Sequence, residues 1–428
     1  MKSSFMKKLV YLCIISYIVF GNALTFNIGQ RLPLKLAEII SIFVMILFLF
    51  DHLSTKIRLN KTLSKLNNWV IWWIIIAILS CFINFLIIGY SLADVLYGLL
   101  YVFRIIHVLL FVVILLYYIK KSNIKFESIT NCIVISFLVV CLIGFIQLVL
   151  FPIAIDWYNL FYKIGVYWET PDPHKYRLIS TYFDPNYLAS ILVIPFSIVL
   201  CRLTFLKEKK IKNLLYLMIF ILAIILTKSR SGIVGLATSL FVFALCFGVQ
   251  RKIPISVLVL IVSAIPVAFY LVFFSNIEVF ERIRTFATDP SAMHRFDSWA
   301  DSLKIFMKYP FVGIGYNMYG AFITMIEGSV ASASGYGVDS SLLFILITTG
   351  IVGGMIFLYG IIKLLSKKSL NFYMYSFKMI IFSSCIISFF NNLLFNVLWI
   401  FPVALIGLLL LKTRGDYNEN SLPFGIKS

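Results

Sequence analysis

The stretch LLYLMIFILAIILTKSRSGIVGLATSLFVFALCFGV, residues 214–249, consists of two apolar runs separated by the polar segment TKSRSG at 227–232. Because neither run alternates apolar and polar residues, we interpret them as two membrane-spanning helices, at 213–227 and 231–249. Two cations, Lys228 and Arg230, then lie at the junction between the helices. Membrane proteins usually avoid cations at such a place, so these two residues point to a function.

The rest of the chain repeats this apolar pattern. Of its 428 residues, 61% are apolar and 13% are charged, and 41 are Phe. A soluble protein of this size could not bury so much apolar surface. Runs of about 20 apolar residues, the length of a membrane-spanning helix, recur along the chain, whereas a membrane barrel would alternate with a period of two. The composition therefore predicts an all-α polytopic membrane protein.

We predict about twelve transmembrane helices in a single integral membrane domain, residues 1–428. Their ranges are 9–24, 35–50, 69–88, 95–118, 129–151, 185–204, 213–227, 231–249, 253–275, 338–363, 372–390 and 393–411. Two long connections, at 152–184 and 276–337, interrupt the series, and a tail follows at 412–428. The basic start also resembles a signal peptide, with Gly21 and Ala23 marking a weak cleavage site. We prefer an uncleaved helix, because it gives an even helix count with both ends on the basic side.

The distribution of charge predicts the orientation of these helices. With the N-terminus inside, the inner connections hold 24 of the 37 Lys and Arg residues and 5 of the 18 acids. The inner side then carries the whole net charge of +19, as the positive-inside rule requires. Both termini are therefore expected in the cytoplasm, both long loops are expected outside, and a nucleic-acid partner is not needed.

The second long loop is expected to contain an amphipathic helix at 290–309. Asp289 suits the N-cap, Pro290 suits the first helical position, and Pro310 ends the pattern. Several apolar residues fall on one arc of this helix. They are Met293, Phe296, Trp299, Ala300, Leu303, Phe306 and Met307. Such a helix would lie along the membrane surface or over the mouth of the bundle.

The candidate binding residues cluster in the outer segments. Arg230 lies between small residues at the predicted start of a helix, where free N–H groups favour an anion, so it suits a phosphate-bearing lipid head. Lys228 and Arg230 alternatively snorkel to lipid headgroups. The segment DPN at 184–186, with Asp184 as N-cap and Asn186 after it, is either a capping motif alone or part of the site. Arg177, seven residues upstream on the same outer surface, is a candidate for the same anion site. His174 is interpreted as a solvated loop residue.

Two further groups remain open to more than one interpretation. Arg104 and His107 lie one turn apart inside a predicted helix, where a paired structural role and a substrate-facing role are equally plausible. Asp339 opens the predicted helix 338–363 and is either its N-cap or a general base. No Walker loop, GxGxxG or HExxH pattern is present, so no metal, nucleotide or other cofactor is expected. The connection 25–34 also contains no carboxylate. We would expect an acid there in a metal-dependent glycosyltransferase that uses a polyprenyl monophosphate donor, so this class is disfavoured.

Three stretches resemble the O-antigen polymerase and ligase superfamily, and the Wzy-type polysaccharide polymerases in particular. They are STYFDPNYLAS at 180–190, TKSRSGIVGL at 227–236, and HRFDSWADSLKIFMKYPFVGIGYNMYG at 294–320 followed by DSSLLFILITTGIVGG at 339–354. In the ligase branch, a His usually stands near the start of that last helix, where this chain has Asp339. The resemblance therefore favours a polymerase over a ligase.

The resemblance implies a membrane glycosyltransferase of O-antigen, capsule or exopolysaccharide synthesis, located in the bacterial plasma membrane. Its substrates would be oligosaccharide repeats carried on undecaprenyl diphosphate and joined at the outer face, with membrane lipids around it and a chain-length regulator and flippase as possible partners. Arg230, Arg295 and Asp339 would be catalytic, with His294 as a second candidate base. Arg177, Asn186, Lys228, His294 and Trp299 would bind substrate. The rivals are a ligase and a lipid-linked oligosaccharide flippase.

Overall fold

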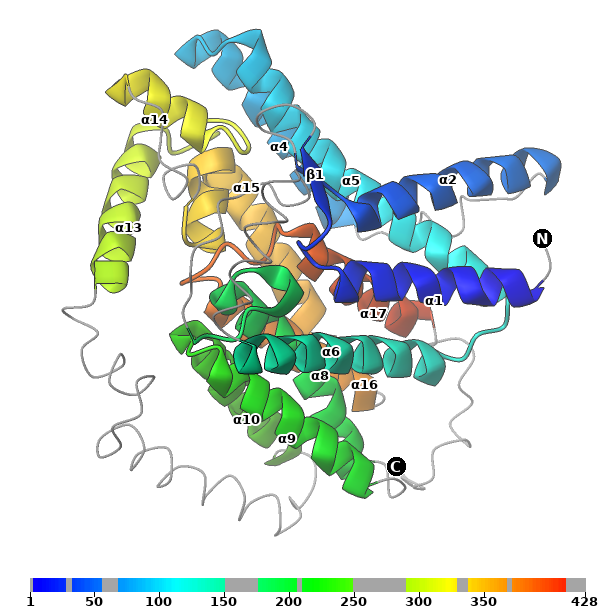
Figure 1. Cartoon of the computed structure of the whole chain (residues 1–428). Coiled ribbons are helices and arrows are strands. Elements are labelled where there is room, and N and C mark those ends of the chain that lie inside the picture. Colours follow the sequence, from blue (N-terminus) through cyan, green and yellow to red (C-terminus); the bar gives the residue numbers. More distant parts are fainter. Residues whose placement is uncertain are drawn as a thin grey trace, which may run out of the picture.

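The computed structural model describes residues 3–27, 33–55, 68–150, 176–205, 210–248, 290–328, 338–367 and 372–412. In these parts the chain forms a bundle of helices with one short hairpin (Figure 1). The elements are α1 (Ser3–Val19), β1 (Thr25–Asn27), β2 (Pro33–Lys35), α2 (Leu36–Thr55), α4 (Asn68–Ile88), α5 (Leu92–Lys121), α6 (Phe126–Val149), the 3-10 turn η1 (Ser180–Tyr182), α8 (Pro185–Phe205), α9 (Lys210–Leu226), α10 (Arg230–Gly248), α13 (Pro290–Lys308), α14 (Tyr319–Glu327), α15 (Ser341–Leu365), α16 (Phe372–Ile387) and α17 (Val397–Lys412).

Helices occupy eleven of the twelve ranges in which the sequence predicts a membrane span. The remaining range, 253–275, lies outside the described residues, as do 413–428 and most of the first long loop. Five described helices are long and apolar enough to cross a bilayer, namely α4, α5, α6, α8 and α15. Shorter apolar helices lie within α10, α16 and α17. The fold is that of an all-α membrane protein, while twelve spans remain a prediction.

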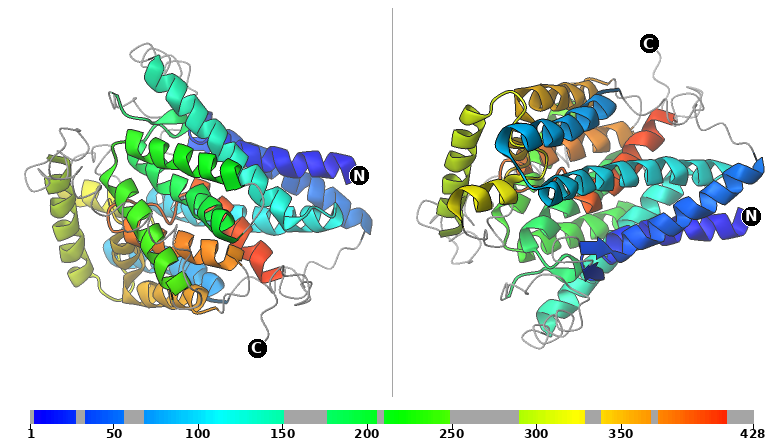
Figure 2. Two further views of the ribbon diagram at one scale, coloured as in Figure 1. Left: turned by 90° about the horizontal axis from the view of Figure 1, so that it is seen from below. Right: turned by 90° about the horizontal axis from the view of Figure 1, so that it is seen from above.

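Helix α8 lies at the centre of one half of the bundle. It is buried along most of its length, and it contacts α6, α9, α10 and α16. Two views at right angles to Figure 1 show α8 among these helices (Figure 2). A helix that is apolar on all sides has no solvated face, so burial on every side is the expected outcome for this sequence. The buried start of α8 is therefore held by several neighbours.

Helix α15 is broken at Gly350, and the break holds the loop that follows α13. Gly350 has φ 65° and ψ −170°, a conformation that glycine adopts without a Cβ penalty. Ile351 N donates to Pro310 O over 2.8 Å, and Ile314 N donates to Ile347 O over 2.8 Å. Irregular backbone at membrane depth is tolerated only where protein satisfies its polar groups. The loop 309–318 pairs with the backbone polar groups at the break in α15. Because this loop directly follows α13, the pairing also fixes the position of the end of α13.

The connection between α16 and α17 is longer than the sequence indicated. We expected helices 372–390 and 393–411, with two residues between them, but α16 ends at Ile387 and α17 begins at Val397. The irregular segment 388–396 contains Asn391, Asn392 and Asn396, whose side chains compete with helical hydrogen bonds. The prediction of a two-residue break was wrong. The sequence also gave no indication of the β1–β2 hairpin or of α14.

Helix α13 occupies the range predicted as amphipathic, but it uses a different face from the one expected. Ser302 and Ile305 are buried, and Arg295 and Trp299 are half-buried. Five members of the expected apolar arc are instead exposed: Met293, Phe296, Ala300, Leu303 and Met307. Helix α13 contacts α15, and its buried face is the one that carries Ser302 and Ile305. Most of the predicted apolar arc therefore points away from the bundle, as in a helix that lies in a membrane interface.

Candidate functional site

The start of α8 is held in place by the loop before it. The Asp184 carboxylate accepts from Asn186 N over 2.7 Å and from Tyr187 N over 3.0 Å, so Asp184 is the N-cap of this helix. Arg177 donates from Nε to Thr227 O over 2.9 Å and from Nη2 to Asn186 Oδ1 over 3.2 Å. The guanidinium of Arg177 therefore bridges the start of α8 and the end of α9.

The start of α10 is tied to the same place. Lys228 has φ 52°, in the left-handed region, which turns the chain sharply between α9 and α10. Ser229 Oγ then donates to Asn186 Oδ1 over 2.9 Å and lies 3.0 Å from Ser231 Oγ. Arg230 is the first residue of α10 and is half-buried. The amide oxygen of Asn186 thus joins Arg177 to the segment that carries Lys228 and Arg230.

Asn391, in the irregular segment between α16 and α17, connects these elements to α15. Its Nδ2 donates to Ser231 Oγ over 2.9 Å and to Ser190 Oγ over 3.1 Å. Its carbonyl oxygen accepts from Ser341 Oγ over 3.2 Å. We refer to the residues that meet here as the Asn391 junction. They are Asn186, Ser190, Ser229, Ser231, Ser341 and Asn391.

Three helices begin at the Asn391 junction, namely α8, α10 and α15. The first N–H groups of a helix have no partners within it and carry a partial positive charge. Part of this donor capacity is used, because Asp184, Ser229 and Ser340 accept from the first turns of α8, α10 and α15 respectively. Arg177 and Arg230 add full positive charges beside two of these starts. The junction is therefore a region of positive potential suited to an anionic group.

Arg295 of α13 and Asp339 lie together at the start of α15. Arg295 Nε is 3.9 Å from Asp339 Oδ2, with the Arg295 side chain 16% exposed and that of Asp339 50% exposed. The N-cap of α15 is Ser340, whose hydroxyl accepts from Leu343 N over 3.4 Å and donates to Ser388 O. The interpretation of Asp339 as the N-cap is therefore wrong. Its carboxylate is directed to Arg295 instead.

Two more of the predicted site residues lie on α13. The Trp299 ring lies 5.9 Å from that of Phe390, next to the Asn391 junction. Trp299 Nε1 is buried and has no hydrogen-bond partner among the described residues. His294 falls on the same helix, one residue before Arg295, but its side chain lies outside what the structure describes. Trp299 and Arg295 therefore place α13 against the start of α15 and the segment 388–396.

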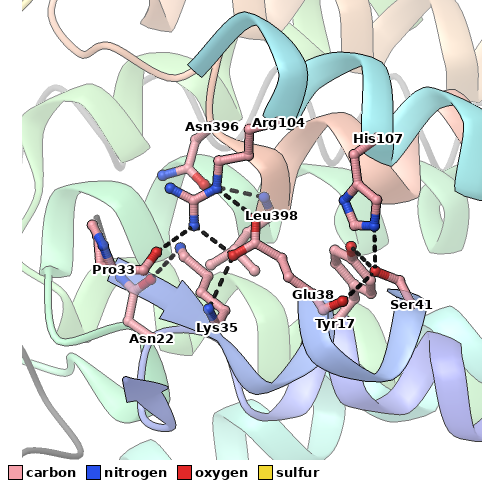
Figure 3. Close-up of polar contacts among 10 residues, drawn as sticks. All are labelled: Tyr17, Asn22, Pro33, Lys35, Glu38, Ser41, Arg104, His107, Asn396 and Leu398. Atoms are coloured by element: carbon pink, nitrogen blue, oxygen red, sulfur yellow. Dashed lines mark hydrogen bonds and ion pairs between the residues drawn. The ribbon is translucent and has the colours of Figure 1, made fainter. Parts of the chain in front are cut away.

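Arg104 and His107 belong to a different cluster, on α1, α2 and α5 (Figure 3). Arg104 Nη2 donates to Glu38 Oε2 over 2.6 Å and to Pro33 O over 3.0 Å, and Arg104 Nε contacts Glu38 Oε1. His107 Nε2 lies 3.0 Å from Ser41 Oγ. Glu38 is only 2% exposed, so the ion pair is buried. Of the two interpretations, the paired structural role fits Arg104.

This buried cluster also connects to the site through Asn22. Lys35 Nζ donates to Asn22 Oδ1 over 2.5 Å, and Lys35 N donates to Glu38 Oε2 over 2.9 Å. Asn22 in turn donates from N to Thr181 O and from Nδ2 to Tyr182 O, both over 2.9 Å. Through η1, the cluster therefore holds the turn that leads to Asp184 and Asn186.

Asn391 and the serines that it contacts were not among the residues predicted for the site. The signal for Asn391 was present, because NNLLFN at 391–396 places three amides in an otherwise apolar run. Polar residues within membrane segments are rare and usually functional or paired. No signal in the sequence indicated which serines would meet them, since Ser190, Ser231 and Ser341 come from three separate helices.

The fold is that of an all-α, multi-pass membrane protein, and these contacts gather cationic side chains near the starts of three helices. Residues 215–358 match the sequence model of a family described as O-antigen ligase. The match confirms the predicted resemblance to the O-antigen polymerase and ligase superfamily, and it includes Arg230, Arg295 and Asp339. No curated protein matches the chain. The match, over about a third of the chain, supports a glycan-processing membrane enzyme of the ligase and polymerase type.

Proposed function

We propose that this protein is a polysaccharide polymerase that joins oligosaccharide repeats carried on undecaprenyl diphosphate at the outer face of a bacterial plasma membrane. A hydroxyl of the acceptor repeat attacks the anomeric carbon of the donor chain. The new glycosidic C–O bond forms as the bond from that carbon to the diphosphate oxygen breaks. The hydroxyl proton passes to a base, and undecaprenyl diphosphate leaves with the bonding electrons.

The observation that carries this proposal is the placement of Arg295 and Asp339 together beside the Asn391 junction. The Arg295 guanidinium supplies a fixed positive charge for the departing diphosphate. The Asp339 carboxylate, half exposed, is accessible to an acceptor hydroxyl and is the first candidate to receive its proton. The two groups therefore offer a cation for the leaving group and an acceptor for the hydroxyl proton at one place.

Arg230 and Arg177 extend the same anion site toward α8 and α10. Negative charge grows on the diphosphate oxygen in the transition state, and each charge-assisted hydrogen bond contributes about 1.5–3 kcal/mol. Arg177 already donates hydrogen bonds to Thr227 and Asn186, so we assign it the role of positioning Asn186. Arg230 and Lys228 are the cations assigned to the lipid diphosphate, and Trp299 borders the site.

A ligase that transfers finished glycan to another acceptor is the second candidate function. The description of the matching family favours it. The carboxylate of Asp339 favours the polymerase, because the ligase branch usually has a His near this position. Both reactions release the same lipid diphosphate, so the cationic site serves either one, and the acceptor decides between them. A flippase would need no group positioned to accept a proton from an acceptor hydroxyl.

The proposal is tested with purified protein in liposomes that contain defined lipid-linked repeats. The wild type should form long lipid-linked chains, while Arg230→Ala and Arg295→Ala should leave single repeats unjoined. Lys304→Ala is the matched control, because Lys304 is an exposed cation on α13 that pairs with Asp301 over 2.8 Å. Wild-type protein that moves repeats across the bilayer without joining them would favour the flippase and contradict the proposal.

Two further experiments distinguish a polymerase from a ligase and determine on which side of the membrane the site lies. Cells with an inactive polymerase lack long chains on the carrier lipid, whereas cells with an inactive ligase accumulate them. Labelling of a cysteine introduced at Thr238, on the exposed side of α10, reports depth, and labelling within 226–232 reports the side of the membrane. A cytoplasmic position for 226–232 would contradict the outer-face site.

A further inference from the structure

A cleft lies away from the cationic site, between the first turn of α5 and α14. Its volume is about 560 Å³, within the range of about 300–1,000 Å³ that is usual for small-molecule sites. The side chains that give it its chemistry are Tyr90, Ser91, Asp94, Tyr97, Thr324 and Met325. In Figure 1, α14 lies beside the end of α4 and the start of α5. It is close to the end of α13 and distant from the start of α13, where Arg295 lies.

The lining combines aromatic rings with hydrogen-bonding groups. Tyr90 and Tyr97 supply two phenol rings, and Asp94 supplies a carboxylate. Ser91 Oγ donates to Asp94 Oδ2 over 2.5 Å and accepts from Asp94 N over 3.2 Å. This contact fixes the Asp94 side chain at the start of α5. The cleft therefore presents apolar ring faces and oriented acceptors side by side.

This chemistry selects among possible ligands. A hydrocarbon chain would desolvate the Asp94 carboxylate without pairing it, which is costly. A phosphate would be repelled by the same carboxylate, and the described residues that line the cleft include no Lys or Arg. A sugar ring fits both features, because its C–H face packs on an aromatic ring and its hydroxyls donate to a carboxylate. The ligand class that the lining favours is an uncharged part of a saccharide.

The floor of the cleft is joined to the loop that positions α13. Tyr90 Oη donates to Ile314 O over 3.0 Å, while Ile314 N donates to Ile347 O in the broken part of α15. Tyr309, at the end of α13, contacts the Phe322 ring of α14 at 5.7 Å. A cleft held in this way needs little ordering when it binds a ligand.

The separation of the cleft from Arg295 suits a glycan chain. Arg295 lies near the start of α13, and Tyr309 follows its end, fourteen residues later. At about 1.5 Å per residue, a helix of that length spans about 20 Å. A single sugar cannot cover such a distance, but an oligosaccharide of several sugars can. The cleft and the cationic site are therefore placed to hold two ends of one extended glycan.

We infer that the cleft between α5 and α14 is an oligosaccharide subsite, which binds sugars of the glycan remote from its diphosphate, with Tyr97 and Asp94 as the principal contacts. This inference rests on the proposed function for the identity of the glycan. It goes beyond that function by assigning binding residues outside the segment that matches the O-antigen ligase family, since Tyr97 and Asp94 precede residue 215.

The test measures binding without catalysis. The probe is the oligosaccharide released by mild acid from the lipid-linked pool of the cell that produces this protein, titrated into detergent-solubilised full-length protein. Saturation-transfer NMR reports contact, and calorimetry reports the dissociation constant. Tyr97→Ala should weaken binding by about tenfold, the upper end of what one aromatic contact contributes. Asp94→Asn, which keeps the shape of the side chain, should also weaken it.

The matched control is Leu96→Ala, because Leu96 is an exposed neighbour on α5, 52% accessible, that does not line the cleft. It should bind the probe as the wild type does. Equal binding by Tyr97→Ala and the wild type overturns the inference, even if polymerisation is intact. If binding depends on Tyr97 but the protein joins no repeats, the subsite is supported. The proposed polymerase function is then contradicted.

Discussion

The Nε atom of Arg295 lies 3.9 Å from Oδ2 of Asp339, although 43 positions separate the two residues in the chain. Arg295 comes from α13, and Asp339 directly precedes the N-cap of α15. The two groups are close enough to attract one another but too far apart for a hydrogen bond. Such a pair can open to admit a diphosphate at the guanidinium and a hydroxyl at the carboxylate.

This relationship predicts that exchanging the two charges does not restore activity. Arg295→Ala and Asp339→Asn should each lower the rate of chain joining by about 100-fold or more, as loss of one transition-state donor does elsewhere. The double variant Arg295→Asp, Asp339→Arg keeps an ion pair but reverses its direction, and it should remain inactive. Rates are measured with lipid-linked repeats in liposomes. Recovery of near-wild-type rates in the exchanged variant would show that the pair only holds α13 to α15.

Asn391 is predicted to matter for activity more than for stability. Asn391→Leu leaves the hydroxyls of Ser190 and Ser231 without the donor that now reaches them, at a cost of about 1–3 kcal/mol. Because the starts of α8, α10 and α15 meet at this side chain, activity should fall further than the loss of stability explains.

Ser239→Ala is the comparison for this variant. It removes one partner of the buried hydroxyl pair Ser239 and Ser383, 2.8 Å apart between α10 and α16, away from the Asn391 junction. Thermal unfolding in detergent and the joining rate are measured for both variants. If Ser239→Ala loses as much activity as Asn391→Leu at equal stability, the junction has no special role.

Gly350 is predicted to be intolerant of any side chain. A Cβ at this position would lie 2.1 Å from Phe311 O, and the backbone has φ 65°. Gly350→Ala must therefore displace the loop 309–318, at a cost of about 1–3 kcal/mol for the overlap and further strain from the left-handed backbone. We expect a lower unfolding temperature and little chain joining, because α13 loses its support.

Gly354→Ala provides the contrast on the same helix. A Cβ there meets only the Leu346 side chain, at 2.8 Å from Cδ2, and that side chain can move. This variant should keep most of its stability and activity. The interpretation of the α15 break fails if the two alanine variants behave alike.

The buried pair of Arg104 and Glu38 predicts a large loss of stability when it is broken. Arg104→Ala leaves the Glu38 carboxylate buried without its guanidinium partner, which typically costs about 3–5 kcal/mol. Lys121→Ala, which removes the more exposed contact of Lys121 with Asp51 at 2.7 Å, should cost about 0–1 kcal/mol. Unfolding in detergent gives both values. Similar losses for the two variants would contradict the buried, structural role of Arg104.

The positions of most helices could be predicted from local sequence, because apolar runs must be helical in a bilayer to satisfy their own backbone. The capping role of Asp184 was also accessible, since an Asp before Pro and Asn is a local signal. The irregular segment 388–396 and the break at Gly350 were not, because both are stabilised by hydrogen bonds from distant elements. The N-cap of α15 is Ser340 rather than Asp339, and a contact with a distant element again contributes, because the Ser340 hydroxyl also donates to Ser388 O.

The sequence by itself determined the all-α membrane class and the segments in which the cations stand, since hydropathy and local capping act over a single helix. Only the tertiary structure decided that Arg177, Asn186, Ser229 and Asn391 meet, that Arg295 faces Asp339, and that Arg104 is bound to Glu38. Charges and amides in a bundle find partners across helices, and the choice among many possible partners is made by packing of whole helices rather than by any neighbouring residue.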